Sequence, residues 1–432
     1  MPKQKKNNCQ LSVVNCRSGQ SLVEIMIGLG LGAVLIGAAS LGITFMLRSS
    51  ASSQNYQKGG QLAGGLFDKV SSWSSGNWQN IYGLIKGTST QYFLNASGTA
   101  LFSVQGQEGM LDNDVTSGLV GEWKFDEATS TTAYDSTGDN KTGTLTNGPV
   151  RTTSGCQIGY CLLFDGTSTY VNAPATSSYS NDVTASVWFK GGGQTASDWN
   201  YWMNSTINWL EFGTFSNGAI FKDNNASGTP SVSAGTTFVD NNWHHAVGII
   251  RSNVMEIWID GQLLGSRSDY PTGQSHSNVG IRIGGNGVAR GWAGYIDDAR
   301  IYNSALSAAE VGNLYRSTAF IRYFTVENVC RTNNSSSSIS GVAPCGGGSI
   351  NDPSTQKISV YTSWLPNNTG SPQLKLSNYI TRWQNQVFNQ SDWTGGAGQD
   401  GPFTSPGRGY STGTNIDGQS NPGSIQILDL TP

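Results

Sequence analysis

The sequence predicts a mainly β protein, built as an antiparallel sandwich, with an apolar N-terminal helix that could cross a membrane. Its composition is the first reason. Only 12% of the 432 residues are charged, and the chain has 56 Gly and 13 Trp, which is typical of short strands and turns. The second reason is the uncharged stretch 25–47. At about 1.5 Å per residue it can span a hydrocarbon core about 30 Å thick.

The charge balance argues against one class of partner. The formal net charge is -3 and the pI is near 5.6. A protein that binds phosphate backbones usually carries a basic patch or stripe. We therefore expect no nucleic-acid partner.

The apolar stretch has a basic N-terminal flank that contains Lys3, Lys5, Lys6 and Arg17, and such a flank stays on the cytoplasmic side. No small-residue cleavage site follows the apolar run, which continues to Arg48. An ordinary secretory signal would have one there. We expect the helix to be retained as a membrane anchor.

Residues 17–24 read Arg-Ser-Gly-Gln-Ser-Leu-Val-Glu and resemble a type IV prepilin (class III) signal. The resemblance implies that a prepilin peptidase cuts between Gly19 and Gln20 and leaves Glu24 as the fifth residue of the mature chain. Two features depart from the commonest pattern. Gln20 stands where Phe is usual, and the helix lacks a proline at its midpoint.

Glu24 also has a physical interpretation. A carboxylate at the edge of an apolar span is costly unless it is paired. The amine freed at Gln20 of a neighbouring pilin-like subunit is the partner that we expect. Gly28 and Gly32 have the spacing that lets membrane helices approach closely. The alternative is a simple membrane anchor that does not assemble.

Strand-like runs bounded by turn residues begin at residue 119. They cover 119–127, 163–171, 185–190, 243–247, 255–264 and 292–307. Together they resemble the laminin-G-like, concanavalin A-like jelly-roll superfamily over roughly 119–315. The resemblance implies two packed antiparallel sheets. It implies no particular activity, because one fold hosts many functions.

Catalysis is not expected. The best carboxylate pair on one strand face is Glu256 and Asp260, about 13 Å apart at about 3.3 Å per residue. Glycosidases need about 5 to 9.5 Å. His244 and His245 alternate faces of a strand, so we expect one to pack and one to meet solvent. A polysaccharide-acting enzyme of the same sandwich class remains an alternative.

Some relatives in this superfamily bind calcium through acidic and carbonyl oxygens, which makes Asp165, Asp297 and Asp298 candidate ligands. The alternatives are a turn at Asp165 and an ion pair between Asp298 and Arg300. A second group of residues is rich in aromatic rings that could stack on sugars, although core packing is the competing interpretation. These residues are Trp199, Tyr201, Trp202 and Trp209.

Cysteine spacing suggests two local disulfides. Cys156 and Cys161 flank a short turn, and Cys330 and Cys345 bracket a Ser/Asn-rich loop. Sequential pairing would give one bridge in each place, and both would form outside the cytoplasm.

Two long strand-like runs, 320–330 and 357–364, are joined by the second Cys-closed loop and look like the C-terminal sheet of a prepilin-like protein. We therefore expect an antiparallel jelly-roll sandwich inserted in a small pilin-like α+β host. The predicted segments are a leader (1–19), a transmembrane or assembly helix (20–53), the first part of the host (54–113), the sandwich (114–317) and the second part of the host (318–432).

These expectations lead to a binding protein. We expect a single-pass membrane protein with an extracytoplasmic domain, or a minor-pilin-like subunit of a cell-surface pilus. Its sandwich would adhere to a glycan or to a surface protein. The alternatives are a membrane-anchored binding protein that does not assemble and the polysaccharide-acting enzyme.

Overall fold

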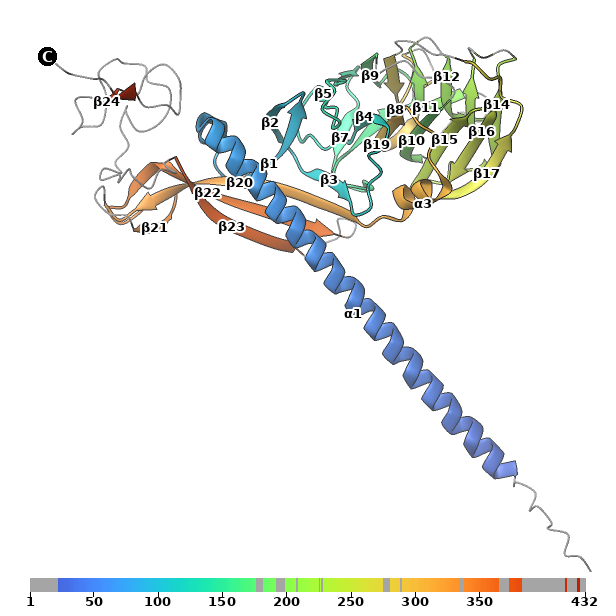
Figure 1. The fold of residues 1–432 in the computed structure, drawn as a ribbon, viewed down its shortest axis with the longest axis horizontal. Helices are drawn as coiled ribbons and strands as arrows, with labels where there is room; N and C mark the ends of the chain where they lie inside the picture. The colour runs from blue at the N-terminus through green and yellow to red at the C-terminus, as the bar shows by residue number, and fades with distance from the viewer. Residues whose placement is uncertain are drawn as a thin grey trace, which may run out of the picture. The chain divides into compact units, whose positions relative to one another are not determined.

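The computed structural model describes residues 22–175, 182–191, 199–206, 209–224, 226, 228–274, 280–287, 290–333, 338–364, 373–382, 416–417 and 426–427. The chain is mainly β, with antiparallel sheets in a jelly-roll-like fold and a long apolar helix near the N-terminus (Figure 1). It divides into two compact units, residues 1–57 and 58–432.

Helix α1 runs from Leu22 to Gly76. From Leu29 it has a mean hydropathy of 2.0 over its most apolar window, and that window is not buried in the protein. By length and composition it could cross a membrane, which agrees with the predicted apolar helix. The predicted processing residues Gly19 and Gln20 lie outside the described residues, and Glu24 is described only as part of the helix backbone.

In the second unit, one sheet combines strands from both ends of the chain. Its order is β2 (Ala100–Gln105), β1 (Gly87–Ser97), β20 (Ala319–Arg331), β22 (Ile350–Trp364) and β23 (Gln373–Thr381). Two shorter strands, β3 (Glu108–Leu111) and β21 (Ile339–Val342), also pair with β20. We call this seven-stranded sheet the host sheet. The limits predicted for the nested segments stay a prediction.

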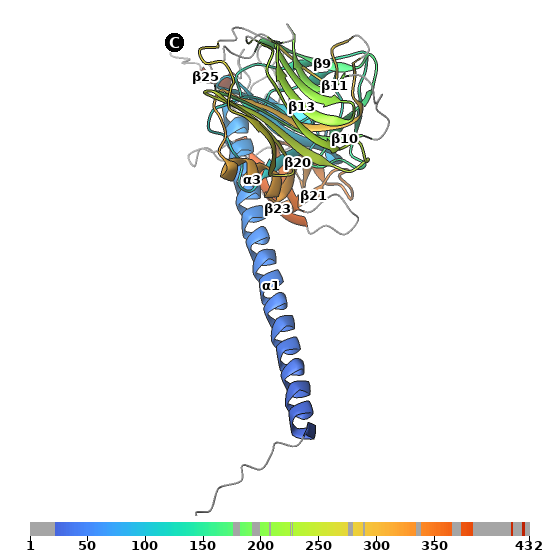
Figure 2. The same ribbon diagram turned by 90° about the vertical axis from the view of Figure 1, so that its right-hand side faces the viewer.

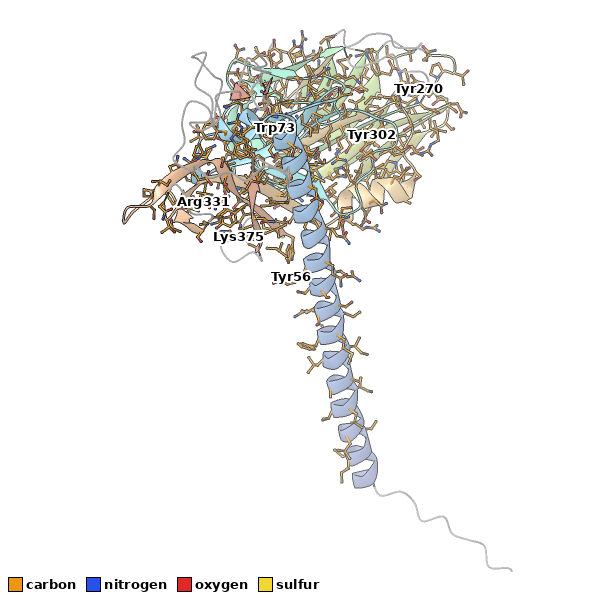
Figure 3. All side chains as sticks on the ribbon, turned by 60° about the vertical axis from the view of Figure 1, so that its left-hand side comes forward. Tyr56, Trp73, Tyr270, Tyr302, Arg331 and Lys375 are labelled. Carbon is orange, nitrogen blue, oxygen red and sulfur yellow. A yellow bond between two sulfur atoms is a disulfide. The ribbon has the colours of Figure 1, made fainter. Side chains whose placement is uncertain are left out.

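The C-terminal part of α1 packs on one face of the host sheet. Ala63, Leu66 and Val70 of the helix share a buried cluster with residues of β20 and β22, including Phe324 and Val360. Trp73, which lies near the end of α1 (Figure 3), donates an indole hydrogen bond of 2.9 Å to the carbonyl of Leu101. The short helix α2 (Gln79–Tyr82) follows.

Two eight-stranded antiparallel sheets form the sandwich (Figure 2). The first sheet is ordered β17 (Gln262–Arg267), β16 (Val254–Ile259), β15 (His244–Arg251), β10 (Val183–Gly191), β19 (Ala293–Tyr302), β8 (Cys161–Asp165) and β7 (Val150–Thr152), with β4 (Leu119–Trp123) also paired to β19. The second is ordered β14 (Ser231–Thr237), β13 (Gly218–Asp223), β12 (Leu210–Phe215), β11 (Trp199–Ser205), β18 (Gly280–Ile283), β9 (Tyr170–Ala175), β6 (Gly143–Thr146) and β5 (Thr132–Ala133).

Aromatic side chains fill the space between these two sheets. Phe189 of β10 and Trp202 of β11 stack with ring centroids 3.7 Å apart, and Trp292 and Phe212 pack against Trp202 edge to face. All four belong to one buried cluster. Because each ring buries a large apolar area, this layer supplies much of the driving force that holds the sheets together.

Helix α3 (Ala308–Arg316) follows the last strand of the sandwich. Its N-cap is Ser307, whose side chain accepts a hydrogen bond from the amide of Glu310, while the Glu310 side chain accepts one from the amide of Ser307. Its buried residues include Val311, which shares a third cluster with Leu111 and Val115 from the segment before the sandwich. The sandwich and the host sheet therefore share buried apolar contacts. A two-residue pair, β24 (Ile416–Asp417) with β25 (Gln426–Ile427), completes the described strands.

Candidate functional site

Trp199 lies at the start of β11 on the outer face of the second sandwich sheet. It pairs across the ladder with Phe215 of β12, and their ring centroids lie 5.6 Å apart. Phe215 is 44% exposed. The ammonium of Lys222 lies 5.7 Å from the centroid of the Trp199 ring. We call Trp199, Phe215 and Lys222 the aromatic platform.

A polar group supports the aromatic platform from its buried side. The hydroxyl of Tyr201 donates a hydrogen bond of 2.6 Å to Glu211 Oε1 and accepts one of 3.1 Å from Arg290 Nη1. Lys222 Nζ lies 3.7 Å from Glu211 Oε2. Burial, and then the hydrogen bond to Glu211, raise the pKa of Tyr201, so its hydroxyl keeps its proton and stays a donor. These bonds fix the side chains under the platform.

The structure separates the four aromatic residues predicted to bind a ligand. Trp199 is partly exposed, and the Tyr201 ring lies beside it, with centroids 5.6 Å apart, but Tyr201 is itself only 1% exposed. Trp202 and Trp209 are buried in the sandwich core, at 0% and 1% exposure. For those two residues the competing interpretation, core packing, matches the structure. The expectation that they contact a ligand has no support in their position.

Sequence reasoning missed Phe215, Lys222 and Glu211. The missing information was the pairing of β11 with β12 and of β12 with β13, which places these residues beside Trp199. One local signal was present. Ser216 and Asn217 form the turn between β12 and β13 with positive φ angles of 50° and 65°, as in a two-residue hairpin.

Asp165, a candidate calcium ligand, is engaged in a turn. Its carboxylate accepts backbone amides from Thr167 at 2.8 Å and from Ser168 and Thr169 at 3.0 Å. Burial opposes the shift, but these hydrogen bonds hold the pKa of Asp165 below its usual range. These contacts match the alternative prediction, in which Asp165 forms a turn.

Asp297 and Asp298 lie on β19. Asp298 Oδ1 accepts a hydrogen bond of 2.9 Å from Arg300 Nε, as the alternative interpretation predicted. Asp297 is fully buried, and its Oδ2 accepts the amide of Ile158 at 2.9 Å. Burial, followed by the nearby charge of Asp126, raises the pKa of Asp297 well above its usual value.

Within the described residues, no group of three or more His, Cys, Asp or Glu side chains is arranged to hold a metal ion. The geometry therefore gives no support to calcium at Asp165, Asp297 and Asp298, and calcium binding stays a prediction.

A buried charge network lies where the sandwich meets the host sheet. Arg300 forms ion pairs with Asp114, Glu122 and Asp298. Lys124 donates to the carbonyl of Gly109 on β3 at 2.9 Å. A cavity of about 10 Å³ lies within this network, enough for about one water. Its lining consists of Gly109, Met110, Leu111, Lys124, Asp126, Ile158, Asp297, Asp298 and Arg300.

The two adjacent histidines alternate as expected. His245 is buried, and its Nε2 lies 2.9 Å from Ser186 Oγ. Burial lowers the pKa of His245 to about 3, so it is neutral. His244 is partly exposed and lies between two carboxylates, with Nδ1 2.8 Å from Asp260 Oδ2 and Nε2 3.1 Å from Asp240 Oδ1. Both nitrogens of His244 are occupied by structural contacts.

Both predicted disulfides are present. Cys156 bonds Cys161 and Cys330 bonds Cys345, each with a Cα–Cα distance of 5.5 Å. This distance is ordinary for a disulfide. The first bridge closes a loop before β8, and the second closes the loop that contains β21.

Comparison with known proteins agrees with the fold. Residues 165–312 match the Laminin_G_3 family model, described as the concanavalin A-like lectin/glucanases superfamily. No curated protein sequence matches the chain. Domain 4 of AbnA, a GH43 extracellular arabinanase from Geobacillus stearothermophilus solved in complex with arabinotriose, is 20% identical. The similarity covers 47% of this chain and 100% of that chain, with a TM-score of 0.41.

Two other solved structures show weaker similarity. The binding domain of Paraclostridial Mosquitocidal Protein 1 is 13% identical, with 59% of this chain and 72% of that chain covered and a TM-score of 0.39. A SAP-like pentraxin from Limulus polyphemus is 14% identical, with 35% and 80% covered and a TM-score of 0.31. These structural similarities carry no conclusion about ligands. The family match supports a domain of the concanavalin A-like lectin/glucanase type at residues 165–312.

Proposed function

We propose that this chain is a membrane-anchored binding protein whose sandwich domain binds a glycan at the aromatic platform. The proposal rests on the partly exposed aromatic pair Trp199 and Phe215. Lys222 lies beside this pair, and the hydrogen bond between Tyr201 and Glu211 lies beneath it. Aromatic faces stack on the apolar C–H faces of sugar rings, and the adjacent ammonium can donate hydrogen bonds to their hydroxyl groups. The fixed geometry under the platform lowers the entropy lost on binding.

Binding rather than turnover is the better proposal for this surface. Glu211, the carboxylate that contacts Lys222 of the platform, is engaged by Tyr201 and Lys222. Glycoside hydrolysis usually needs two carboxyl groups flanking the scissile bond. Glu256 and Asp260, the pair considered from the sequence, are likewise engaged, by Trp258 and by His244. A polysaccharide-acting enzyme stays as the second candidate, and the experiment below includes it.

The proposed location is outside the cytoplasm. The exposed apolar helix supports a membrane anchor, and the two disulfides support an oxidising compartment. Export by the prepilin route rests on the spacing between Gly19 and Glu24. A helix packed on an antiparallel sheet is in keeping with a pilin-like host. Assembly with pilin-like subunits is the finer proposal, and a non-assembling anchor is its alternative.

The experiment uses the full chain in lipid nanodiscs on an array of immobilised glycans and surface proteins. We expect glycan binding that persists in excess chelator and leaves the glycan intact, as judged by mass spectrometry. Capture by the immobilised proteins alone would favour a surface protein as the ligand and contradict the glycan proposal. Shortened glycans would establish the enzyme alternative.

A further inference from the structure

The loop closed by Cys156 and Cys161 turns two of its backbone amides inward. Ile158 N donates to Asp297 Oδ2 at 2.9 Å, and Tyr160 N donates to Asp126 Oδ1 at 3.1 Å. Both carboxylates are almost fully buried, at 0% and 2% exposure. The loop therefore supplies donors to two acidic groups that are almost fully buried.

Asp126 connects this loop to the host sheet. Its second oxygen, Oδ2, accepts the backbone amide of Gly109 on β3 at 2.5 Å. Strand β3 in turn pairs with β20, where Gly109 lies opposite Ile321. The Asp126 carboxylate thus accepts one hydrogen bond from the disulfide loop and another from the host sheet.

The side chain of Ile158 makes a second connection to the host sheet. It is 7% exposed and shares a buried cluster with Leu111 and Val115. A Cβ placed on Gly109 would lie 2.5 Å from Ile158 Cγ2, so the backbone of β3 runs directly against this side chain. Withdrawal of the loop would remove both an apolar contact and a hydrogen-bond network.

The loop must hold a specific conformation to make these contacts. Gly159 has a φ of +62°, and a Cβ there would lie 2.1 Å from Asp126 Oδ1. An open chain of this length samples many conformations, and a covalent bridge removes most of them.

We propose that the Cys156–Cys161 bridge is a redox-controlled latch that locks β3 of the host sheet onto the sandwich when it is oxidised. The dithiol form arises when external thiols reduce the bridge by thiol–disulfide exchange and are themselves oxidised to a disulfide. The loop is then free to withdraw the amides of Ile158 and Tyr160. Two buried carboxylates then lose donors, which is costly. Opening of the β3 contact lets water reach both groups. The reduced chain therefore favours an open junction around Gly109.

The oxidising step is a thiol–disulfide exchange. The thiolate of one cysteine attacks a disulfide of the oxidant, which is itself a protein or small-molecule disulfide, and forms a mixed disulfide. The thiolate of the second cysteine then displaces the oxidant's sulfur and closes the Cys156–Cys161 bond. Two protons are released from the cysteines, two electrons pass to the oxidant, and its two sulfur atoms leave as thiols after protonation.

The test compares amide hydrogen exchange in full-length wild type and in the double variant Cys156→Ser/Cys161→Ser, both in nanodiscs. We expect the peptide that contains Gly109 to exchange at least tenfold faster in the variant. The strand β12 (Leu210–Phe215), in the sandwich core, should keep its wild-type rate. The matched control Cys330→Ser/Cys345→Ser removes the other bridge and should leave exchange at Gly109 unchanged.

A further variant leaves the disulfide in place. Gly159→Ala puts a Cβ against Asp126 Oδ1 and should also speed exchange at Gly109, with the bridge confirmed by mass spectrometry. Unchanged exchange at Gly109 in either the double cysteine variant or Gly159→Ala would overturn the latch. Equally fast exchange in β12 of the double variant would overturn it too, because the bridge would then be holding the whole sandwich.

Discussion

Arg300 Nη2 on β19 lies 2.9 Å from Glu122 Oε1 on β4, and their side chains are only 3% and 5% exposed. Arg300 also pairs with Asp298 and with Asp114, which lies between β3 and β4. Burial of charge is costly unless every charge keeps its partners. One guanidinium therefore neutralises carboxylates from three separate segments where the host sheet and the sandwich meet.

Arg300→Met should destabilise the protein by about 3–5 kcal/mol. It leaves the buried Asp298 without its guanidinium partner, and it leaves Glu122 with only the ammonium of Lys124, 3.8 Å away. Urea unfolding of the full chain, followed by tryptophan fluorescence, measures this loss. The control Arg267→Met removes an ion pair to Asp269 in which the Arg267 side chain is 31% exposed and the Asp269 side chain is 73% exposed. The control should leave the unfolding midpoint unchanged. Equal midpoints for Arg300→Met and wild type would contradict the network's structural role.

Stability should fall with rising pH because of His244. The hydrogen bond to Asp260 is the main cause that raises the pKa of His244, helped by Asp240 and opposed by burial. Asp240 stays charged in this range, since hydrogen bonds from Asn242 lower its pKa to about 2. The raised pKa means that the stabilisation is complete below the unfolded value, about 6.5, and is lost as pH rises through the higher folded value.

Urea midpoints of wild type and His244→Gln between pH 5.5 and 9 measure this contribution. The wild-type advantage should be about 1 kcal/mol at pH 5.5 and should shrink at higher pH. Because Gln keeps a polar side chain but cannot be charged, its curve should be flatter over this range. A constant difference between the two proteins at all pH values would mean that His244 does not titrate there.

Substitutions of Trp202 and Trp199 should differ in their effect on stability, because Trp202 packs in the core and Trp199 is partly exposed. Trp202→Ala removes a fully buried ring that contacts Phe189, Phe212 and Trp292, and should cost about 3–5 kcal/mol. Trp199→Ala, at the partly exposed platform, should cost much less. Calorimetric unfolding of both variants provides the comparison. A larger loss of stability for Trp199→Ala than for Trp202→Ala would contradict the assignment of Trp202 to the core.

The prepilin-type signal predicts a mature chain that begins at Gln20. Intact-mass measurement of the membrane-extracted protein, expressed with a prepilin peptidase, tests this prediction. Gly19→Val should block the cut and leave the leader attached, because it changes the residue at the expected cleavage site. A mature protein that keeps Met1, or one cut after Leu47, would contradict the assignment of a prepilin-type signal.

The sequence predicted those parts of the structure that depend on local pattern. The apolar helix and the short-range disulfide Cys156–Cys161 follow from composition and spacing. The turn between β16 and β17 has positive φ at both Asp260 and Gly261, which the Asp-Gly dipeptide favours. The Asp298–Arg300 pair lies within one strand. Each of these features can be recognised within a few neighbouring residues.

The site depends on contacts that the sequence does not reveal. The β11 ladder shifts register between Tyr201 and Met203. Alternation places Trp199 and Trp202 on opposite faces of the strand, but it does not show which face meets the other sheet. The hydrogen bond from Ile158 N to Asp297 joins residues 139 positions apart. Such a contact exists only after the sheets have formed.

The central claim is glycan binding at the aromatic platform, and the most direct measurement is the affinity of full-length Trp199→Ala for the glycan identified on the array. Loss of one stacking contact should weaken binding about tenfold, equivalent to about 1.4 kcal/mol. The control Tyr379→Ala removes a 42% exposed aromatic side chain from β23 of the host sheet and should bind like wild type. Wild-type affinity in Trp199→Ala would contradict the claim.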